Sequence, residues 1–368
     1  MKLPLTIKLA CWLLIAVLGA IILIYAKDFL LPIIIAALLS LLLYPVYKRL
    51  VKWKVPGVLS VIITMLIVLS IITIAILFIS KEITSVLVDL GGLSNKMSEK
   101  LSHLQTYMYT HWQIEDATFT GWMINAKVKL MAYSGDLLSG TIATTTNIFS
   151  TLLLIGVYVF CFLLYNSDFK DFAFALMELE KRDEATGIIS NIQKLVQHYL
   201  LGMLTVILII GSLNTIGLLI IGIDHAVFFA FFAATLTIIP YIGIFIGALL
   251  PVAYTLITHD SVLPAVGVTA VFFTVQFLES NFITPKIVGR RVSINPFVAI
   301  VVLLIGGQLW GTAGMILAIP LTAILKVLLD HRPKAKAFGY FLGSEFTDKN
   351  SNPLKIFGPR KTTLKKKE

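Results

Sequence analysis

Long apolar stretches separated by short polar gaps run through most of the chain, and this pattern predicts membrane-spanning helices. An α-helix needs about 20 mostly apolar residues to cross the hydrocarbon core of a bilayer. Six stretches approach that length: Ile7–Ala26, Leu30–Tyr47, Val58–Ile79, Ile148–Tyr165, Tyr199–Ile221, and one with its core at Thr269–Thr284 that begins near Val262. We therefore expect an all-α fold, a polytopic transmembrane helical bundle.

Two further apolar stretches are too long for a single span and contain helix breakers. Phe228–Ile257 is interrupted at Pro240-Tyr241-Ile242-Gly243 and again at Pro251, and Phe297–Leu329 contains Gly306, Gly307, Gly311, Gly314 and Pro320. Proline removes a helix hydrogen bond and clashes with the preceding turn, so one straight helix is not expected in either stretch. We predict two re-entrant or broken helical hairpins that enter from opposite faces of the membrane. The alternative is that each proline only kinks an ordinary span.

Composition supports the membrane assignment, and the distribution of charge orients the chain. The 368 residues are 58% hydrophobic and 14% charged, with a mean hydropathy of +0.91, whereas soluble domains are about 45–50% apolar and about 25% charged. The net charge of +10 is concentrated in Lys48–Lys54, Lys286–Arg291 and the tail Lys326–Glu368. Basic residues beside spans mark the cytoplasmic side, so we place both termini there. No recognition helix or aromatic-interleaved basic surface is apparent, so we expect membrane lipid and no nucleic acid as a partner.

The predicted spans and gaps divide the chain into six segments. They are N-terminal transmembrane helices 1–3 (1–80), an extracytoplasmic helical segment (81–147), transmembrane helix 4 (148–165), cytoplasmic amphipathic helices (166–198), a C-terminal transmembrane core with the broken hairpins (199–329), and a basic cytoplasmic tail (330–368). Within the second segment, apolar residues from Val86 to Met108 recur at helical spacing. We favour a contact of this stripe with a neighbouring helix of the same chain over pairing between subunits, and we expect a homo-oligomer.

The segment from Gln276 to Lys286 places polar side chains in an otherwise apolar span. Gln276 and Glu279 are three residues apart and share one helix face. A carboxylate at bilayer depth costs about 2.5–3.5 kcal/mol on insertion scales, and it usually faces protein or water along an ion or substrate path. We therefore favour Glu279 as a proton-carrying or binding group. The structural alternative is an ion pair with Lys286 or Arg290.

Other intramembrane residues are weaker candidates. Pro240, Tyr241 and Gly243 would expose backbone groups at a hairpin tip, where they can bind an ion or polar solute, although a simple turn is the alternative. The pairs Gly243/Gly247 and Gly307/Gly311 permit close helix approach, and packing is the favoured interpretation. We interpret Asn214 and Gln308 as interhelix hydrogen-bonding amides and His225 and His259 as exposed boundary residues rather than metal ligands.

Motifs that mark common enzymes are missing from the sequence. It has no Gly-x-x-x-x-Gly-Lys-Ser/Thr loop for nucleotide phosphates. It also lacks His-Glu-x-x-His and Gly-x-Ser-x-Gly, which mark metal and serine hydrolases. We therefore expect no catalytic residues, no metal site and no cofactor. Any transport would draw on an ion gradient or on the gradient of the solute.

The second half of the chain carries a series of motifs, namely Ile239–Gly243, the run from Gln276 through Asn281 and Pro285 to Gly289, Val292–Pro296, Gly306–Gly314 and Leu317–Pro320. Together they resemble the autoinducer-2 exporter (AI-2E, PerM-like permease) family of bacterial membrane transporters. The block covers about a quarter of the chain. Glu279 stands at the family's acidic position, whereas Ser280 stands where glycine is frequent.

The resemblance implies a multi-pass protein of the bacterial cytoplasmic (inner) membrane that exports autoinducer-2 or exchanges sodium for protons. Because members differ in function, the substrate does not follow from the fold. We expect a secondary transporter of a small polar solute or of cations. Its expected transport or coupling residues are Glu279, Gln276, Asn281, Pro240, Tyr241, Gly243, Pro285, Gly307 and Gly311. The alternative function is a non-transporting oligomeric membrane scaffold.

Overall fold

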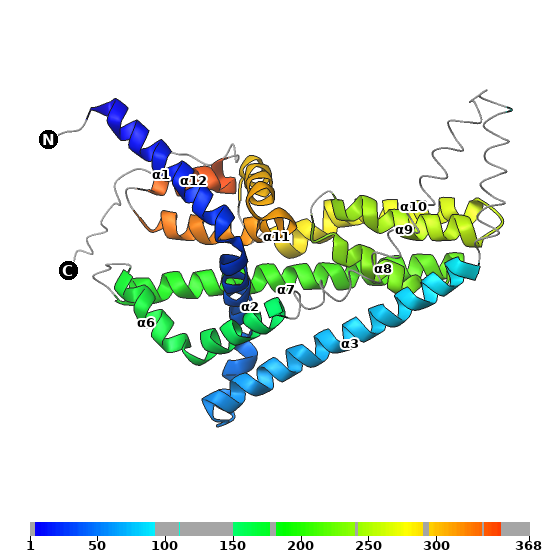
Figure 1. Cartoon of the computed structure of the whole chain (residues 1–368), viewed down its shortest axis with the longest axis horizontal. Helices are drawn as coiled ribbons and strands as arrows, with labels where there is room; N and C mark the ends of the chain where they lie inside the picture. Colours follow the sequence, from blue (N-terminus) through cyan, green and yellow to red (C-terminus); the bar gives the residue numbers. More distant parts are fainter. Residues whose placement is uncertain are drawn as a thin grey trace, which may run out of the picture. The chain divides into compact units, whose positions relative to one another are not determined.

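The computed structural model describes residues 4–92, 110, 150–176, 182–239, 242–289, 294–332 and 335–346. Its named elements are all helices (Figure 1), and the described residues contain one isolated β-bridge, between Ile294 and Gly343. The all-α prediction is therefore confirmed.

Helices long and apolar enough to cross a membrane occur where the hydrophobic pattern predicts them. Five helices meet this requirement by length and composition, over Lys27–Lys52, Gly57–Val86, Ala185–Ile221, Leu263–Ile287 and Pro296–Asp330, and the last of these is broken at Gly311. A sixth would result if Ser150–Leu164 and Asn166–Phe172, which meet at a 75° bend, form one broken span. The predicted first span lies on the helix α1 (Leu5–Tyr25). The chain is thus a multi-pass membrane protein.

The first half of the chain forms regular helices that pack side by side. α2 (Lys27–Lys52), α3 (Gly57–Gly92) and the helix Ser150–Leu164 bury one cluster, whose fully enclosed members are Ala36, Val61, Val159 and Leu163. α6 (Asn166–Leu176) follows this third helix. Lys170 of α6 donates a hydrogen bond to the Tyr44 hydroxyl at 3.3 Å, which attaches the amphipathic segment to α2.

The helix α7 (Arg182–Ile221) is continuous across the boundary expected at 198/199. The sequence there changes from amphipathic to apolar, but no proline interrupts it, and the backbone remains helical. A change in polarity shows which solvent surrounds a helix, whereas ending the helix requires a breaker or a cap. The second amphipathic helix and the predicted span are therefore one element of 40 residues.

The chain forms two compact units, and α7 contributes to both. One unit comprises residues 1–178 and 200–288, and the other comprises 179–199 and 289–368. The first unit contains α8 (Ala226–Leu236), α9 (Ile242–Thr258) and α10 (Leu263–Leu278), together with two π-helical segments, η1 (Glu279–Ile283) and η2 (Pro285–Gly289). The second contains α11 (Pro296–Asp330), α12 (Lys336–Leu342) and the short 3₁₀ helix η3 (Ser344–Phe346).

The predicted hairpin over Phe228–Ile257 is formed by α8 and α9 (Figure 1). α8 has 11 residues, so it rises only about 16 Å, roughly half of a hydrocarbon core. The two helices pack closely because Gly247 has no side chain. A Cβ atom on Gly247 would lie 2.8 Å from the Ala233 Cβ. A Cβ on Gly243 would overlap the carbonyl oxygen of Leu236.

The second predicted hairpin lies within α11. Its backbone leaves helical geometry at Trp310 and Gly311, where Gly311 has φ +62° and ψ −143°. Residues eight apart in a straight helix are separated by about 12 Å, yet a Cβ on Gly306 would lie 2.5 Å from the Gly314 carbonyl oxygen. The chain therefore reverses at this point, and the prediction of two broken hairpins is confirmed. Their entry from opposite membrane faces stays a prediction.

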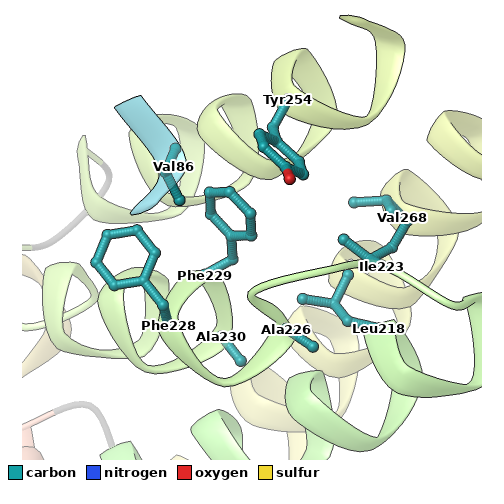
Figure 2. Close-up of a cluster of buried hydrophobic side chains, with 9 residues drawn as sticks. All are labelled: Val86, Leu218, Ile223, Ala226, Phe228, Phe229, Ala230, Tyr254 and Val268. Carbon is teal, nitrogen blue, oxygen red and sulfur yellow. The ribbon is translucent and has the colours of Figure 1, made fainter. Parts of the chain in front are cut away.

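The main core of the first unit is a cluster of aromatic and small side chains from α3, α7, α8, α9 and α10 (Figure 2). Phe229 of α8 is fully buried at its centre, and Tyr254 of α9 contacts the Phe229 ring with a centroid separation of 5.0 Å. Alanines at 226 and 230 let the neighbouring helices approach α8 closely. This core fixes α7–α10 relative to one another, and the candidate site lies on the same four helices.

Candidate functional site

Glu279 lies where α10 passes into the π-helical segment η1, and two neighbouring side chains bind its carboxylate. The Gln276 amide Nε2 donates to Glu279 Oε2 at 2.5 Å, and the Thr284 hydroxyl donates to Oε1 at 3.3 Å. Gln276 Nε2 also lies 3.1 Å from the Ser280 hydroxyl oxygen. The structure thus brings Gln276 and Glu279 together, as their spacing predicts. It adds Thr284 as a second donor to the carboxylate.

The wide helical turns at Glu279 have a local cause in the sequence. Pro285 lacks an N–H group, and in an α-helix its ring would clash with the carbonyl of the residue four positions earlier. The wider turns of η1 end two residues before this proline, and those of η2 begin at it. Single π-helical turns inside α-helices are frequent at functional sites. Here the π-helical turns place the Thr284 hydroxyl within hydrogen-bonding distance of the Glu279 carboxylate.

No cation neutralises Glu279 among the residues that the structure describes. Glu279 is half-buried, while Lys286 is exposed and makes no ion pair with it. Arg290, the other partner of the structural alternative, lies outside the described residues. The geometry therefore favours a carboxylate held by neutral donors over an ion pair with Lys286.

The remaining polar residue of the motif is oriented differently. Asn281 is exposed, and its Nδ2 donates to the Phe277 carbonyl oxygen at 2.9 Å. It therefore belongs to another face of the helix than Gln276 and Glu279. Pro285 is exposed and acts on the site through the backbone.

A cavity of about 390 Å³ lies between α7, α8, α9 and α10. One of its lining residues is Gln276, whose amide donates to the Glu279 carboxylate. Its lining is mostly apolar, with polar side chains at Asn214, Thr237, Thr269 and Gln276. Ligand pockets in proteins are commonly apolar clefts of about 300–1,000 Å³ with a few polar groups. This cavity fits that description, and Gly243 of the predicted set is one of its lining residues.

Asn214 is a site residue for which the sequence predicts a different role. A hydrogen bond to a neighbouring helix is expected, but Asn214 is 3% exposed and its Oδ1 has no hydrogen-bond partner among the described residues. Glycines three residues to either side place other helices near it. A Cβ on Gly211 would lie 2.8 Å from the Phe231 ring, and a Cβ on Gly217 would overlap Val271. The sequence does contain one signal of this arrangement. Gly211, Asn214 and Gly217 follow one another at intervals of three residues, which places them on one face of α7.

The other predicted residues are not all in one place. Pro240 and Tyr241 lie outside the described residues. Gly307 and Gly311 belong to the second compact unit, where a Cβ on Gly307 would lie 2.6 Å from the Met315 methyl carbon and Gly311 forms the reversal of α11. These two glycines therefore have structural roles in the second hairpin, and any transport role for them stays a prediction.

His225 is not the exposed boundary residue that the sequence predicts, and the structure corrects this. Its side chain is only 16% exposed, and its Nδ1 lies 2.8 Å from Glu82 Oε2 of α3. The ring also packs edge-on against Tyr254 at 5.9 Å. The contact joins residues 143 positions apart, so no local pattern in the sequence could indicate it.

Proteins with similar sequences are named as transport proteins or candidate transport proteins. Over 325 residues, the chain is 24% identical to a protein of Escherichia coli (strain K12) named AI-2 transport protein TqsA, covering 86% of this chain and 90% of that one. Identity to YrrI of Bacillus subtilis (strain 168) is 28% over 316 residues (83% and 87%), and to YueF of the same organism it is 27% over 311 residues (80% and 82%). Both of these are described as candidate transport proteins. The sequence model of the AI-2E family transporters matches residues 12–334, so this chain belongs to the AI-2E transporter family.

Proposed function

We propose that this AI-2E family transporter is a secondary transporter that exports a small polar solute or exchanges cations for protons, with Glu279 as the coupling carboxylate. The observation that carries the proposal is the geometry of Glu279. It lies on a π-helical turn of an apolar helix, it accepts hydrogen bonds from Gln276 and Thr284, and no described residue forms an ion pair with it.

A carboxylate in this setting can alternate between two states. As an anion it accepts both hydrogen bonds, and after protonation its own O–H can donate, so that the side chains around it must rearrange. Its proton binding is thereby linked to the arrangement of α10, and α10 also forms one wall of the cavity. This linkage is what an ion-coupled transporter needs between a proton site and a solute site.

The name of the relative TqsA supports autoinducer-2 as the first solute to test. Sodium is the first cation to test, because the family resemblance includes sodium–proton exchange. We further propose a bacterial cytoplasmic membrane location with both termini inside, and membrane lipid and further copies of the chain as partners. The basic gaps support the orientation, and a fusion of green fluorescent protein to the C-terminus would fluoresce only if that end is cytoplasmic.

The test uses purified protein in liposomes that contain a pH-sensitive dye. Addition of autoinducer-2 or of sodium ions to the wild type should change the internal pH. Glu279→Gln keeps the size of the side chain and one of its two acceptor oxygens but removes the titrating group, and it should abolish the coupled pH change. The matched control is Asp224→Asn, an exposed carboxylate on the loop before α8, which should transport normally.

The same experiment separates the alternative function. If folded wild-type protein moves neither autoinducer-2 nor sodium, the non-transporting scaffold gains support. That function rests on the apolar stripe Val86–Met108, most of which lies outside the described residues. Normal proton coupling in Glu279→Gln would remove Glu279 from the mechanism while leaving transport itself standing.

A further inference from the structure

We propose that the cavity between α7 and α10 is a binding site for a small neutral molecule with an apolar body and a hydroxyl or N–H group, and that Asn214 Oδ1 accepts the hydrogen bond from that group. The inference rests on the proposed transport function in one respect, that the bound molecule is the one transported. Binding itself requires only the cavity and Asn214.

The first step is the state of Asn214. The residue is 3% exposed and lines the cavity, and its side-chain carbonyl oxygen has no hydrogen-bond partner among the described residues. A buried acceptor without a partner is destabilising, and native proteins leave few of them. A molecule that donates a hydrogen bond in the cavity would remove this defect.

The second step is the character of the other polar groups in the lining. The Thr237 hydroxyl donates to the Ala234 carbonyl at 2.7 Å, and the Thr269 hydroxyl donates to the Ala265 carbonyl at 2.9 Å. Their protons are thus used within their own helices, and only acceptor lone pairs remain for an occupant. The Nε2 protons of Gln276 are directed to Glu279 and Ser280. Apart from the Nδ2 protons of the Asn214 amide, the lining therefore offers acceptors, and a molecule with a hydroxyl or N–H donor is complementary to it.

The third step excludes a charged occupant. None of the residues that line the cavity carries a charge, and a buried ion without a counter-charge or several hydrogen bonds is very unfavourable. Of the two solute classes in the proposed function, the cavity therefore favours the neutral solute. A cation would have to bind elsewhere, and the carboxylate of Glu279 accepts a hydrogen bond from the lining residue Gln276.

The fourth step concerns the two ends of the cavity. Asn214, Ile210, Ala233 and Val275 are buried and form its inner end. Phe245 and Phe273 are 79% and 74% exposed and form its outer end, together with Leu249. A molecule with an apolar body and one polar end fits this gradient, with its donor at Asn214 and its body between the two phenylalanines.

The experiment uses two photoreactive probes in lipid nanodiscs containing the full chain. One is a short alkyl diazirine that ends in a hydroxyl group, and the other has the same skeleton but ends in a methyl group. We expect saturable labelling of the α9 and α10 segments that carry Phe245 and Phe273 by the hydroxyl probe. Its half-saturating concentration should be about tenfold or more below that of the methyl probe, the factor expected for one hydrogen bond to a buried acceptor.

Asn214→Leu tests the acceptor directly. This variant keeps the branched shape and the number of heavy atoms of the side chain, and it should erase the difference between the two probes. When no probe is present, the variant should also unfold at the same temperature as the wild type or at a higher one. If Asn214 instead formed a hydrogen bond to a neighbouring helix, the variant would unfold at a lower temperature. Asn191→Leu, an exposed amide on the same helix, is the matched control and should keep the difference. Ala248→Leu fills the cavity and should reduce labelling even if Asn214→Leu fails to fold.

The outcomes distinguish the site from the transport function. Equal labelling by both probes, or an unchanged preference in Asn214→Leu, would overturn the proposal and indicate that the cavity takes apolar chains such as those of lipids. Preserved probe preference in Glu279→Gln together with lost coupling would support both proposals separately. Transport of autoinducer-2 by Asn214→Leu at the wild-type rate, with labelling lost, would refute the role of this site in transport but leave the proposed function intact.

Discussion

Replacing Gly247 by alanine is the sharpest test of the α8–α9 packing, because two opposing effects differ in size. The added Cβ would lie 2.8 Å from the Ala233 Cβ and 2.9 Å from the Ala233 Cα, whereas carbon atoms in contact prefer about 3.5–4.0 Å. The helices must therefore separate by roughly 1 Å or distort, and overpacking of this kind costs about 1–3 kcal/mol. Alanine in a helix interior gains about 0.5–1 kcal/mol over glycine. The cost of the clash exceeds this gain, and we expect a net loss of about 1–2 kcal/mol in the free energy of unfolding.

The assay is thermal unfolding of purified protein in detergent. A loss of this size should lower Tm by about 2–8 °C, on the scale of roughly 2–4 °C per kcal/mol for domains of 150–250 residues. The matched control is Gly19→Ala in α1, where a Cβ would meet nothing within 4 Å, and it should leave Tm unchanged or raise it. Ala233→Gly added to Gly247→Ala should recover part of the loss, because it removes the nearer of the two atoms. A Gly247→Ala protein as stable as Gly19→Ala would refute the close approach of α8 and α9.

Two further substitutions test other parts of the structure by the same measurement. Gly311→Ala places a side chain at φ +62° and ψ −143°, a region nearly restricted to glycine, and should destabilise the second hairpin by about 1–3 kcal/mol; an unchanged Tm would show that α11 does not reverse there. His225→Ala removes the partner of the half-buried Glu82 carboxylate and should cost about 1–3 kcal/mol. Glu82→Gln in the His225→Ala background should restore part of it, and additive losses in the double variant would contradict the contact.

The helices and hairpins could be predicted from the sequence because their causes are local. The length of an apolar run determines whether a helix can cross a bilayer, and Pro240, Gly311 and their neighbours break the two runs that are too long. The pairing of Gln276 with Glu279 is local as well, since residues three apart share a helix face. Each of these predictions needed only the covalent neighbours of the residues concerned.

Features that depend on distant parts of the chain could not be predicted in this way. The contact of His225 with Glu82 and the unpaired Oδ1 of Asn214 depend on which helices surround each side chain. An intramembrane asparagine gives the same sequence signal whether it binds a neighbouring helix or faces a cavity. The continuity of α7 has another cause, because a change in polarity does not determine where a helix ends. The π-helical turns at Pro285 are not predictable either, because the sequence marks the break but not its geometry.

The position of Asn214 bears on what the α7–α10 arrangement is for. Gly211 and Gly217 bring α8 and α10 against the same face of α7, so the packing on either side of Asn214 is close. An arrangement optimised only for stability would place an apolar side chain at position 214 and fill the cavity, which avoids both an unpaired acceptor and an empty volume. Proteins depart from such rules mainly at functional sites. Under the binding proposal, this close packing holds an opening between Asn214 and Gln276, and an occupant of that opening would be linked through the Gln276 amide to the Glu279 carboxylate.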